Sequence, residues 1–413
     1  MRQGRPGAVP GSDRRYGRIG TIPGSVPDGS AIRTGSPRPG RDETVSDELA
    51  DRTVLVDPHA LGGMTEFDVP PALEPGDRVA IVAPASNPAP EFPHVYERGL
   101  DRLENVFGLE PVEFPTASRG EAYLYEHPEA RARDVMAAFT DPEIRGVVTV
   151  IGGNDQIRIL DHLDRGLLRE NPTRFFGYSD NTHLALTLWN EGIVSFQGPS
   201  VMTELAMDGF MFDLTVEYAR KAFFGDAIGE LRPAEAFTDE PADWTDPATL
   251  ETPRETEPNP GWQWAGGGER VSGRIWGGCL EIIDQWLLAD RFAPPDSALD
   301  GSVLAIETSE EVPPATWVAG VCRALGERGL LERFDGVLVG RPPGRSHLES
   351  HPPEWRERYR ERQREVIADV LAEYNPAAPV VTGLEFGHTY PTVALPIGGH
   401  VEIDPGTERI VLG

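Results

Sequence analysis

Cysteine and long apolar runs are scarce in this chain of 413 residues. Its two cysteines, Cys279 and Cys322, are too few for a disulfide framework and lack the Cys-x-x-Cys spacing of a metal site, so we expect reduced, buried thiols. No apolar run reaches the roughly 18 residues that span a bilayer. No apolar segment typical of a secretory signal follows the N-terminus. These absences predict a soluble, cytoplasmic protein with no membrane partner.

Lysine is nearly absent, and the charge is strongly negative. The formal net charge is −29, and Lys221 is the one lysine among 38 basic residues. Residues 1–41 hold eight arginines and two aspartates, so the rest of the chain holds 30 basic and 65 acidic residues. Such a surface repels a phosphate backbone, so we expect no nucleic-acid partner. It suits a protein kept soluble in concentrated salt; a GC-rich genome that favours arginine is the alternative explanation.

Residues 1–63 differ in composition from the rest of the chain. They are rich in Gly, Pro, Ser and Arg and show neither helical nor strand periodicity. A sequence of globular character begins at Met64, after the charge reverses near residue 42. We therefore expect residues 1–63 to be a disordered tail, or an extension upstream of a true start at Met64.

Strands and helices alternate over residues 64–229. We expect strands at 78–84, 146–153, 174–179 and 193–199, and helices at 92–106, 128–140, 155–163 and 180–192. Such alternation is typical of a mostly parallel sheet with helices on both faces. The pattern therefore predicts an N-terminal α/β domain.

Residues 230–268 interrupt this alternation with an aperiodic stretch rich in Pro, Asp, Glu and Trp. A stretch this long is either functional or disordered, and its tryptophans favour an ordered, functional loop. A second domain follows over 269–413. Its expected strands are 270–275, 302–307, 335–340, 379–383, 392–397, 400–403 and 409–412, and its expected helices are 279–289, 314–328 and 354–374.

Ser179 lies where an apolar strand turns directly into a helix. A side chain there is exposed at the carboxyl end of the strand, close to the free N–H groups of the next helix. That is the arrangement of a nucleophile elbow, although the second glycine of G-x-S-x-G is missing. An ordinary helix cap formed by Ser179 or Asp180 is the alternative.

The turn at 151–155 follows another buried strand and contains two glycines. Its backbone can approach a ligand closely, and Gly153 together with Asp180 could supply the two N–H donors of an oxyanion hole. The turn lacks the lysine and the spacing of a phosphate-binding loop. A plain tight turn explains it equally well.

Glu307 and His388 are the other candidates for chemistry. Glu307 ends an apolar strand, and His388 lies in a loop between Gly387 and a Tyr-Pro pair. A solvated strand end and a surface histidine are the alternatives. His183 is one helical turn from Ser179, but helix geometry directs its side chain along the helix. His94, His127, His162 and His183 show no metal-binding spacing, so we expect no metal site.

Eight segments in order resemble the LD-carboxypeptidase family of serine peptidases over about residues 70–413. They are PGDRVAIVAPAS, VVTVIGGND, FFGYSDNTHLAL, FQGPSVM, GRIWGGCLE, LAIETSEE, VLVGRP and GLEFGHTYPTVALPIG. Each is a modest signal alone, and their common order across two domains is a strong one. Within this family the chain is most similar to the microcin C immunity branch.

The resemblance implies an α/β fold with an N-terminal flavodoxin-like, doubly wound parallel sheet and a C-terminal swivelling β/α domain. It implies a catalytic triad of Ser179, Glu307 and His388 across the cleft, with Gly153 and Asp180 as the oxyanion hole. It further implies amide hydrolysis through an acyl-enzyme without a cofactor, and a homodimer.

The same resemblance points to a small peptide or peptide–nucleotide substrate and a detoxifying role. It places Trp244 in a loop over the site, where the indole would stack on a nucleobase or pack the loop onto the body, and it makes Asn154 a substrate contact. Cys279 stands where the family often has asparagine, so an amide contact would be lost or weakened. A murein tetrapeptide carboxypeptidase, an esterase or acyltransferase, and a non-catalytic binding protein are the alternatives.

Overall fold

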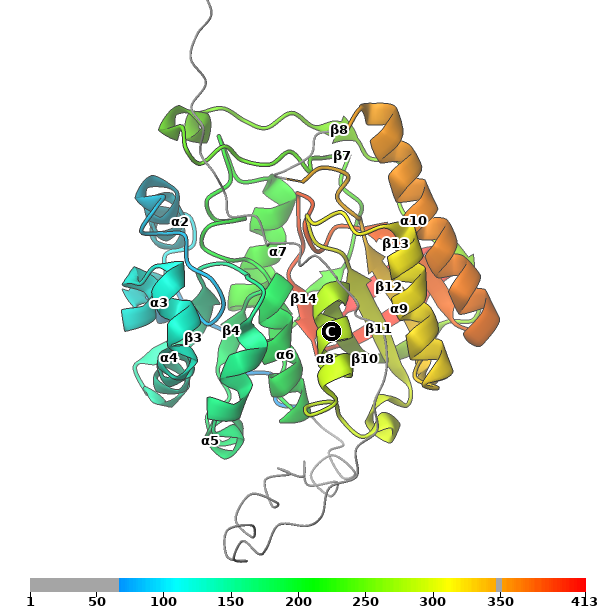
Figure 1. The fold of residues 1–413 in the computed structure, drawn as a ribbon, viewed down its shortest axis with the longest axis horizontal. Helices are drawn as coiled ribbons and strands as arrows, with labels where there is room; N and C mark the ends of the chain where they lie inside the picture. Colours follow the sequence, from blue (N-terminus) through cyan, green and yellow to red (C-terminus); the bar gives the residue numbers. More distant parts are fainter. Residues whose placement is uncertain (1–66, 347–350) are drawn as a thin grey trace, which may run out of the picture. The chain divides into compact units, whose positions relative to one another are not determined.

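A computed structural model describes residues 67–346 and 351–413 (Figure 1). The tail predicted at 1–63 and the start proposed at Met64 lie outside the described residues. Within the two described ranges, no helix combines the length and the apolar character needed to cross a bilayer.

Six strands form the first sheet in the order β14-β5-β4-β3-β1-β2. Their bounds are Arg78–Val82 (β1), Glu110–Glu113 (β2), Ile144–Thr149 (β3), Arg174–Phe176 (β4), Ser195–Gln197 (β5) and Leu395–Ile397 (β14). β1 to β5 run parallel, and the order β2-β1-β3-β4-β5 is that of a flavodoxin-like doubly wound sheet. β1 is a continuous apolar run, as expected of a strand covered on both sides. The predicted fold class is confirmed.

Helices connect the parallel strands. Their bounds are Pro93–Asn105 (α2), Glu121–Glu126 (α3), Pro128–Thr140 (α4), Arg165–Glu170 (α5), Thr182–Asn190 (α6) and Asp213–Phe224 (α7). α2 buries Val95, Gly99 and Leu103 at helical spacing. Gly99 is needed there because a Cβ would lie 2.2 Å from the carbonyl oxygen of Val201.

The segment 155–163 differs from the predicted helix, because it forms the tighter 3-10 helix η2 over Gln156–His162. The backbone N–H groups of Asp155 and Gln156 both donate to the Asp180 carboxylate, at 3.0 and 2.9 Å. These bonds hold the start of the segment against the neighbouring strand end, and a 3-10 helix is the usual form of such a short connection.

Eight strands form the second sheet in the order β6-β16-β15-β10-β11-β12-β13-β9. Their bounds are Gly229–Glu230 (β6), Gln263–Gly266 (β9), Val271–Cys279 (β10), Ser302–Glu307 (β11), Phe334–Gly340 (β12), Pro379–Leu384 (β13), His400–Asp404 (β15) and Arg409–Leu412 (β16). β10 to β13 run parallel, and the flanking pairs are antiparallel. The associated helices are Leu280–Ala289 (α8), Ala315–Glu327 (α9) and Pro353–Tyr374 (α10). α9 and α10 lie side by side (Figure 1).

The two sheets exchange edge strands, which the sequence boundaries did not predict. β14 comes from the C-terminal segment but pairs antiparallel with β5, and β6 comes from the N-terminal segment but pairs with β16. An edge strand carries unpaired backbone groups, so β14 completes the hydrogen bonding of β5. Pro396, which has no N–H to donate, lies in this outermost strand, where proline is tolerated.

The segment 230–268 has defined structure and is attached by charged and polar contacts. It contains the short pair β7 (Ala236–Phe237) and β8 (Glu257–Pro258), the 3-10 helix η4 (Pro247–Glu251) and β9. Glu257 forms ion pairs with Arg345, Arg356 and Arg360. These ion pairs attach the segment 230–268 to the rest of the protein. Trp244, in the middle of the segment, lines the cavity described in the next section.

Candidate active site

A cavity of about 990 Å³ lies at the carboxyl ends of the parallel strands of both sheets. From the first sheet it is lined by Gly152, which follows β3, and by Ser179, which follows β4. From the second sheet it is lined by Cys279 at the end of β10 and by His388 after β13. Ligands bind at the carboxyl ends of strands in open α/β sheets, and here two such edges share one cavity.

Ser179 has an unusual backbone conformation at the edge of this cavity. Its φ is 61°, in the left-handed region that residues with a side chain rarely adopt. Gly152 packs directly against it, because a Cβ at that position would lie 2.6 Å from Ser179 Cβ and 2.8 Å from its Oγ. The neighbouring turn therefore requires glycine, and the half-buried Ser179 side chain faces the cavity.

Asp180 ties this turn to the one after β3. Its Oδ2 accepts the N–H groups of Asp155 and Gln156, and Asn181 Nδ2 donates to the carbonyl of Ile151 at 3.1 Å. Burial raises the pKa of Asp180 to about 7, although the two N–H donors lower it. The two predicted oxyanion-hole residues are therefore neighbours, since a Cβ on Gly153 would lie 3.2 Å from Asp180 Oδ2.

Glu307 and His388 form a tight pair beside the cavity. His388 Nδ1 is 2.6 Å from Glu307 Oε2, and 8% of the His388 side chain and 0% of the Glu307 side chain are exposed. Gly387 makes this approach possible: its φ is +96°, and a Cβ there would lie 2.5 Å from Glu307 Oε2. The ring of Tyr178 packs on the imidazole with 5.1 Å between ring centroids.

The neighbouring carboxylates raise the pKa of His388. Burial alone would lower it, but the carboxylates of Glu307 and Glu310 outweigh burial and raise the pKa to about 10. A carboxylate on Nδ1 also orients the ring, so that Nε2 is the nitrogen left for a proton transfer.

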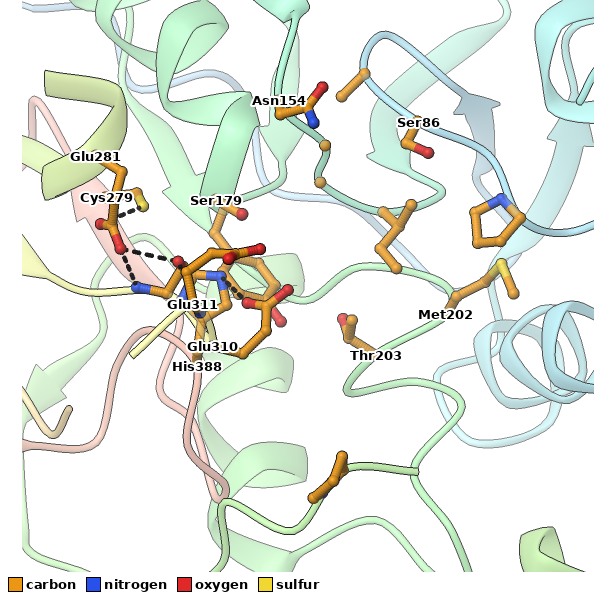
Figure 2. A pocket seen from close by; sticks show the side chains of 18 of the residues that line it. Ser86, Asn154, Ser179, Met202, Thr203, Cys279, Glu281, Glu310, Glu311 and His388 are labelled. Carbon is orange, nitrogen blue, oxygen red and sulfur yellow. Dashed lines mark hydrogen bonds and ion pairs between the residues drawn. The ribbon is translucent and has the colours of Figure 1, made fainter. Parts of the chain in front are cut away.

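Nε2 of His388 forms no hydrogen bond with another described residue. The nearest charged atom is Oε2 of Glu310, at 3.4 Å. In Figure 2, Glu310 and Glu311 lie beside His388 and Ser179 at the same part of the cavity. Nε2 is therefore beside a carboxylate, and His388 and Ser179 line the same cavity.

Two residues proposed to bind substrate also line this cavity. Asn154 is exposed in the turn after β3, and Trp244 is half-buried in the segment 230–268. The indole packs edge-on against Phe92 with 5.6 Å between ring centroids. Both roles considered for Trp244 are thus compatible with its position, since it packs the loop and still lines the cavity.

Both cysteines are free and buried, as predicted. The thiol of Cys279 donates to Glu281 Oε2 at 3.2 Å, and burial raises its pKa well above the ordinary value. Cys322 lies in α9, where burial raises its pKa to about 12. Neither thiol is poised to ionise, so neither is a competing nucleophile.

His183 does not reach the cavity. Its ring is fully buried and stacks on Trp286, with 5.9 Å between centroids. Burial lowers its pKa to about 4. Helix geometry had predicted that this side chain runs along the helix and away from Ser179, and its position agrees with that prediction.

Sequence reasoning missed Gly152, Glu281 and Glu310 as site residues. Gly152 could have been found as the first glycine of the turn, because a close approach to Ser179 forbids a side chain there. Glu281 accepts the N–H and the hydroxyl of Ser309 at 2.9 and 2.8 Å, which fixes the loop carrying Glu310. Glu281 and Glu310 lie within the segments GRIWGGCLE and LAIETSEE, but no feature of these segments assigned either glutamate a role.

The fold combines a parallel α/β sheet with a second mixed sheet, and a serine at positive φ and a carboxylate–imidazole pair line one cavity. Family models identify it further: residues 79–198 match the LD-carboxypeptidase N-terminal domain and residues 272–403 match the LD-carboxypeptidase C-terminal domain. The chain belongs to the LD-carboxypeptidase family, as its sequence motifs had predicted.

Similar proteins span nearly the whole chain. The "Probable murein peptide carboxypeptidase" of Bacillus subtilis is 28% identical over 83% of this chain and 93% of its own. The microcin C7 self-immunity protein MccF of Escherichia coli is 22% identical over 81% of this chain and 92% of its own. The structure of an MccF-like protein from Streptococcus pneumoniae in complex with AMP superimposes with a TM-score of 0.72, at 27% identity over 82% of this chain and 99% of its own.

Proposed function

We propose that this protein is a serine amidase that hydrolyses a peptide or peptide–nucleotide amide bond with Ser179, His388 and Glu307. The observation that carries the proposal is the 2.6 Å contact between His388 Nδ1 and Glu307 Oε2 at a cavity that both His388 and Ser179 line. A base held by a buried carboxylate beside a strained serine is the arrangement of nucleophilic acyl transfer.

The proposed steps follow from these atoms. Neutral His388 Nε2 accepts the Ser179 proton as Oγ forms a bond to the substrate carbonyl carbon. The carbon–nitrogen bond then breaks, and the same proton passes from Nε2 to the leaving amine. Water, deprotonated by His388, next attacks the acyl-enzyme carbonyl, and the proton returns to Ser179 as the acid is released. Glu307 stabilises the imidazolium in both halves.

The negative charge on the carbonyl oxygen requires hydrogen-bond donors. We assign this role to the backbone N–H groups of Gly153 and Asp180, because the Asp180 carboxylate fixes the two turns against each other. Donors fixed before the reaction stabilise the developing charge without reorganisation.

The substrate is proposed to be a small peptide conjugated to a nucleotide, and the chain to act as a homodimer in detoxification. Trp244 supplies an aromatic face in the cavity and Asn154 an exposed amide. The AMP bound to the pneumococcal relative supports the nucleotide part. A murein peptide is the second candidate, favoured by the similarity to the murein peptide carboxypeptidase.

The direct test is to trap the acyl-enzyme. We expect a rapid acid quench during turnover of an aminoacyl-nucleotide or a murein peptide to leave the acyl group on the peptide that contains Ser179, as found by mass spectrometry. An adduct on another residue, or turnover without any adduct in a Ser179-dependent reaction, would contradict the mechanism. Hydroxylamine or an added amine as acceptor separates hydrolysis from acyl transfer, and ester analogues separate amidase from esterase.

Replacing Trp244 by alanine should weaken binding of a nucleotide conjugate. Stacking of a base on an aromatic ring is worth roughly 1–3 kcal/mol, so we expect KM to rise about tenfold with kcat nearly unchanged. Trp244→Phe should recover most of the affinity. A peptide without a nucleotide is the matched substrate: an equal rise in its KM would assign Trp244 to packing against Phe92 instead.

A further inference from the structure

A second imidazole lies behind the proposed oxyanion hole and has no part in the proposed reaction. His183 lies in the first turn of α6, four residues after Ser179, and its side chain is fully buried. Its Nε2 lies 3.7 Å from Oδ1 of Asp180, whose side chain is also 0% exposed. A buried polar ring costs free energy unless its N–H group has an acceptor. The Asp180 carboxylate is an acceptor in the right place.

Asp180 uses one of its two oxygens in the bonds to the neighbouring turn. Oδ2 accepts the N–H groups of Asp155 and Gln156, whereas Oδ1 forms no hydrogen bond with another described residue. Burial raises the pKa of Asp180 to about 7, so the carboxylate is mostly ionised at pH 8. The charge of Arg131 lowers this pKa, but its guanidinium N–H groups donate to Asp155. Nε2 of His183 therefore lies where Oδ1 needs a donor.

The surroundings of His183 indicate which ring nitrogen carries the proton. Two acceptors face Nε2, because Gln285 Oε1 lies 3.4 Å away in addition to Asp180 Oδ1. Nδ1 forms no hydrogen bond with another described residue, and the ring stacks on Trp286. Burial lowers the pKa of His183 to about 4, so the ring is neutral at pH 8 and holds one proton. That proton is stabilised on Nε2, between the two acceptors.

This contact lies where the two sheets meet. Asp180 and His183 follow β4 of the first sheet, whereas Gln285 lies in α8 of the second and lines the cavity. α6 and α8 pack side by side (Figure 1). The hydroxyl of Thr182 accepts the N–H of Cys279 at 3.1 Å across the same boundary. The place of the His183 ring is therefore set by both sheets.

The proposed oxyanion hole depends on the orientation of the Asp180 carboxylate. Oδ2 holds the start of the segment that follows Gly153, and the N–H of Asp180 itself is the second proposed donor. A carboxylate bound through one oxygen can rotate about its Cβ–Cγ bond, and this rotation would release the N–H groups of Asp155 and Gln156. A donor at Oδ1 opposes the rotation. Oxyanion donors stabilise charge best when they are ordered before the reaction.

We propose that His183 is a positioning residue that holds the Asp180 carboxylate through its Nε2–H and thereby fixes the two N–H donors of the oxyanion hole. This inference rests on the proposed amidase function. His183 does not line the cavity, so it acts through Asp180 and not on the substrate. The alternative is a ring that only fills space beside Trp286, for which the nitrogen atoms would be unimportant.

Two substitutions separate these roles. His183→Phe keeps an aromatic ring beside Trp286 but removes the N–H, and His183→Gln supplies an amide N–H near the position of Nε2. Removing a whole oxyanion donor costs about 10²- to 10³-fold in kcat, so we expect His183→Phe to lower kcat about tenfold with KM nearly unchanged. His183→Gln should restore kcat to within about threefold of the wild type. The substrates are an aminoacyl-nucleotide and a murein tetrapeptide.

His162→Phe is the matched control, because it makes the same replacement at an exposed histidine of η2. We expect its kcat to equal that of the wild type. A His183→Phe protein with wild-type kcat, or equal losses in His183→Phe and His183→Gln, would overturn the positioning role.

Nitrogen-15 NMR of the wild-type protein, labelled at histidine, tests the contact without turnover and without a substitution in the observed chain. At pH 8 we expect His183 to carry its proton on Nε2. The His183→Gln protein, which lacks these resonances, identifies them. A proton on Nδ1, or a charged ring, would overturn the inference.

Hydrogen exchange tests the effect on the neighbouring turn. The amides of Asp155 and Gln156 should exchange about tenfold faster in His183→Phe than in the wild type, because the carboxylate that accepts them is less well held. His183→Gln should exchange at nearly the wild-type rate. Unchanged exchange in His183→Phe would overturn the inference whatever the activity.

The outcomes distinguish this inference from the amidase function. Ser179-dependent turnover that is unaffected by His183→Phe would remove the role of His183 and leave the amidase function standing. Faster exchange in His183→Phe alone would support the positioning of Asp180 even if turnover did not depend on Ser179. That second result would count against the amidase function and not against the contact.

Discussion

Replacing Ser179 by alanine is expected to reduce kcat by about 10³- to 10⁶-fold, because losing a triad nucleophile leaves only binding and oxyanion stabilisation. The fold should be retained, since the change removes one half-buried hydroxyl. The measurements are single-turnover kinetics on the amide substrate and a thermal unfolding curve.

Ser86→Ala is the matched control for that experiment. Ser86 lines the same cavity, but its hydroxyl donates to Glu121 at 2.8 Å and lies outside the proposed triad. We expect this variant to keep most of the activity. If Ser179→Ala protein turned over substrate at the wild-type rate, another residue would have to be the nucleophile and the proposal would fail.

Glu307→Gln should have the second largest effect, a loss of about 10⁴-fold in kcat. Glutamine preserves the volume of the side chain but removes the charge that stabilises the imidazolium during acyl transfer. Glu126→Gln, which makes the same chemical change on the cavity wall, should change kcat little. Full activity of the Glu307→Gln protein would rule out Glu307 as the triad acid.

The Glu307→Gln variant also tests how the free energy of unfolding depends on pH. The pKa of His388 is raised to about 10, above its usual value of about 6.5 in an unfolded chain, so the imidazolium stabilises the folded state. This contribution is complete below about pH 6.5 and is lost as the pH rises through about 10. The difference in unfolding free energy between wild type and Glu307→Gln should therefore be larger at pH 6 than at pH 10. A difference independent of pH would contradict the charged pair.

These predictions connect strain, charge and reactivity in one site. Ser179 has a φ of 61°, and its side chain leaves no room for a Cβ on Gly152 in the neighbouring turn. His388 is held by a carboxylate on one nitrogen and approached by Glu310 on the other. In the proposed mechanism the first residue is the nucleophile and the second is its base.

Much of the fold could be predicted from the sequence because its signals are local. The run RVAIV at β1 and the apolar spacing of α2 follow from the burial of neighbouring residues along one element. Predicted and observed bounds therefore agree closely for α4 and β11. The segment 155–163 forms the 3-10 helix η2 instead of the predicted helix, and its first N–H groups donate to Asp180 from another strand end, a contact that no local pattern predicts.

The candidate site was less accessible to such reasoning. From its own segment alone, Ser179 could equally be interpreted as a helix cap. The segments of Glu307 and His388 gave no indication of which residues they contact. Their motifs became informative through the resemblance to a family, which also supplied their proposed roles. Glu310 lies in the segment LAIETSEE, but its contact with Nε2 of His388 depends on how the loop after β11 folds.

The sequence by itself determined the alternation of strands and helices, the buried thiols and the places where side chains emerge at strand ends. The tertiary structure alone decided that residues 81 positions apart, Glu307 and His388, approach to 2.6 Å, and that β14 returns to the first sheet. It also decided that Glu310 faces Nε2 of His388. The physical reason is that burial along one element is a local property, whereas contacts between loops depend on strand order and register.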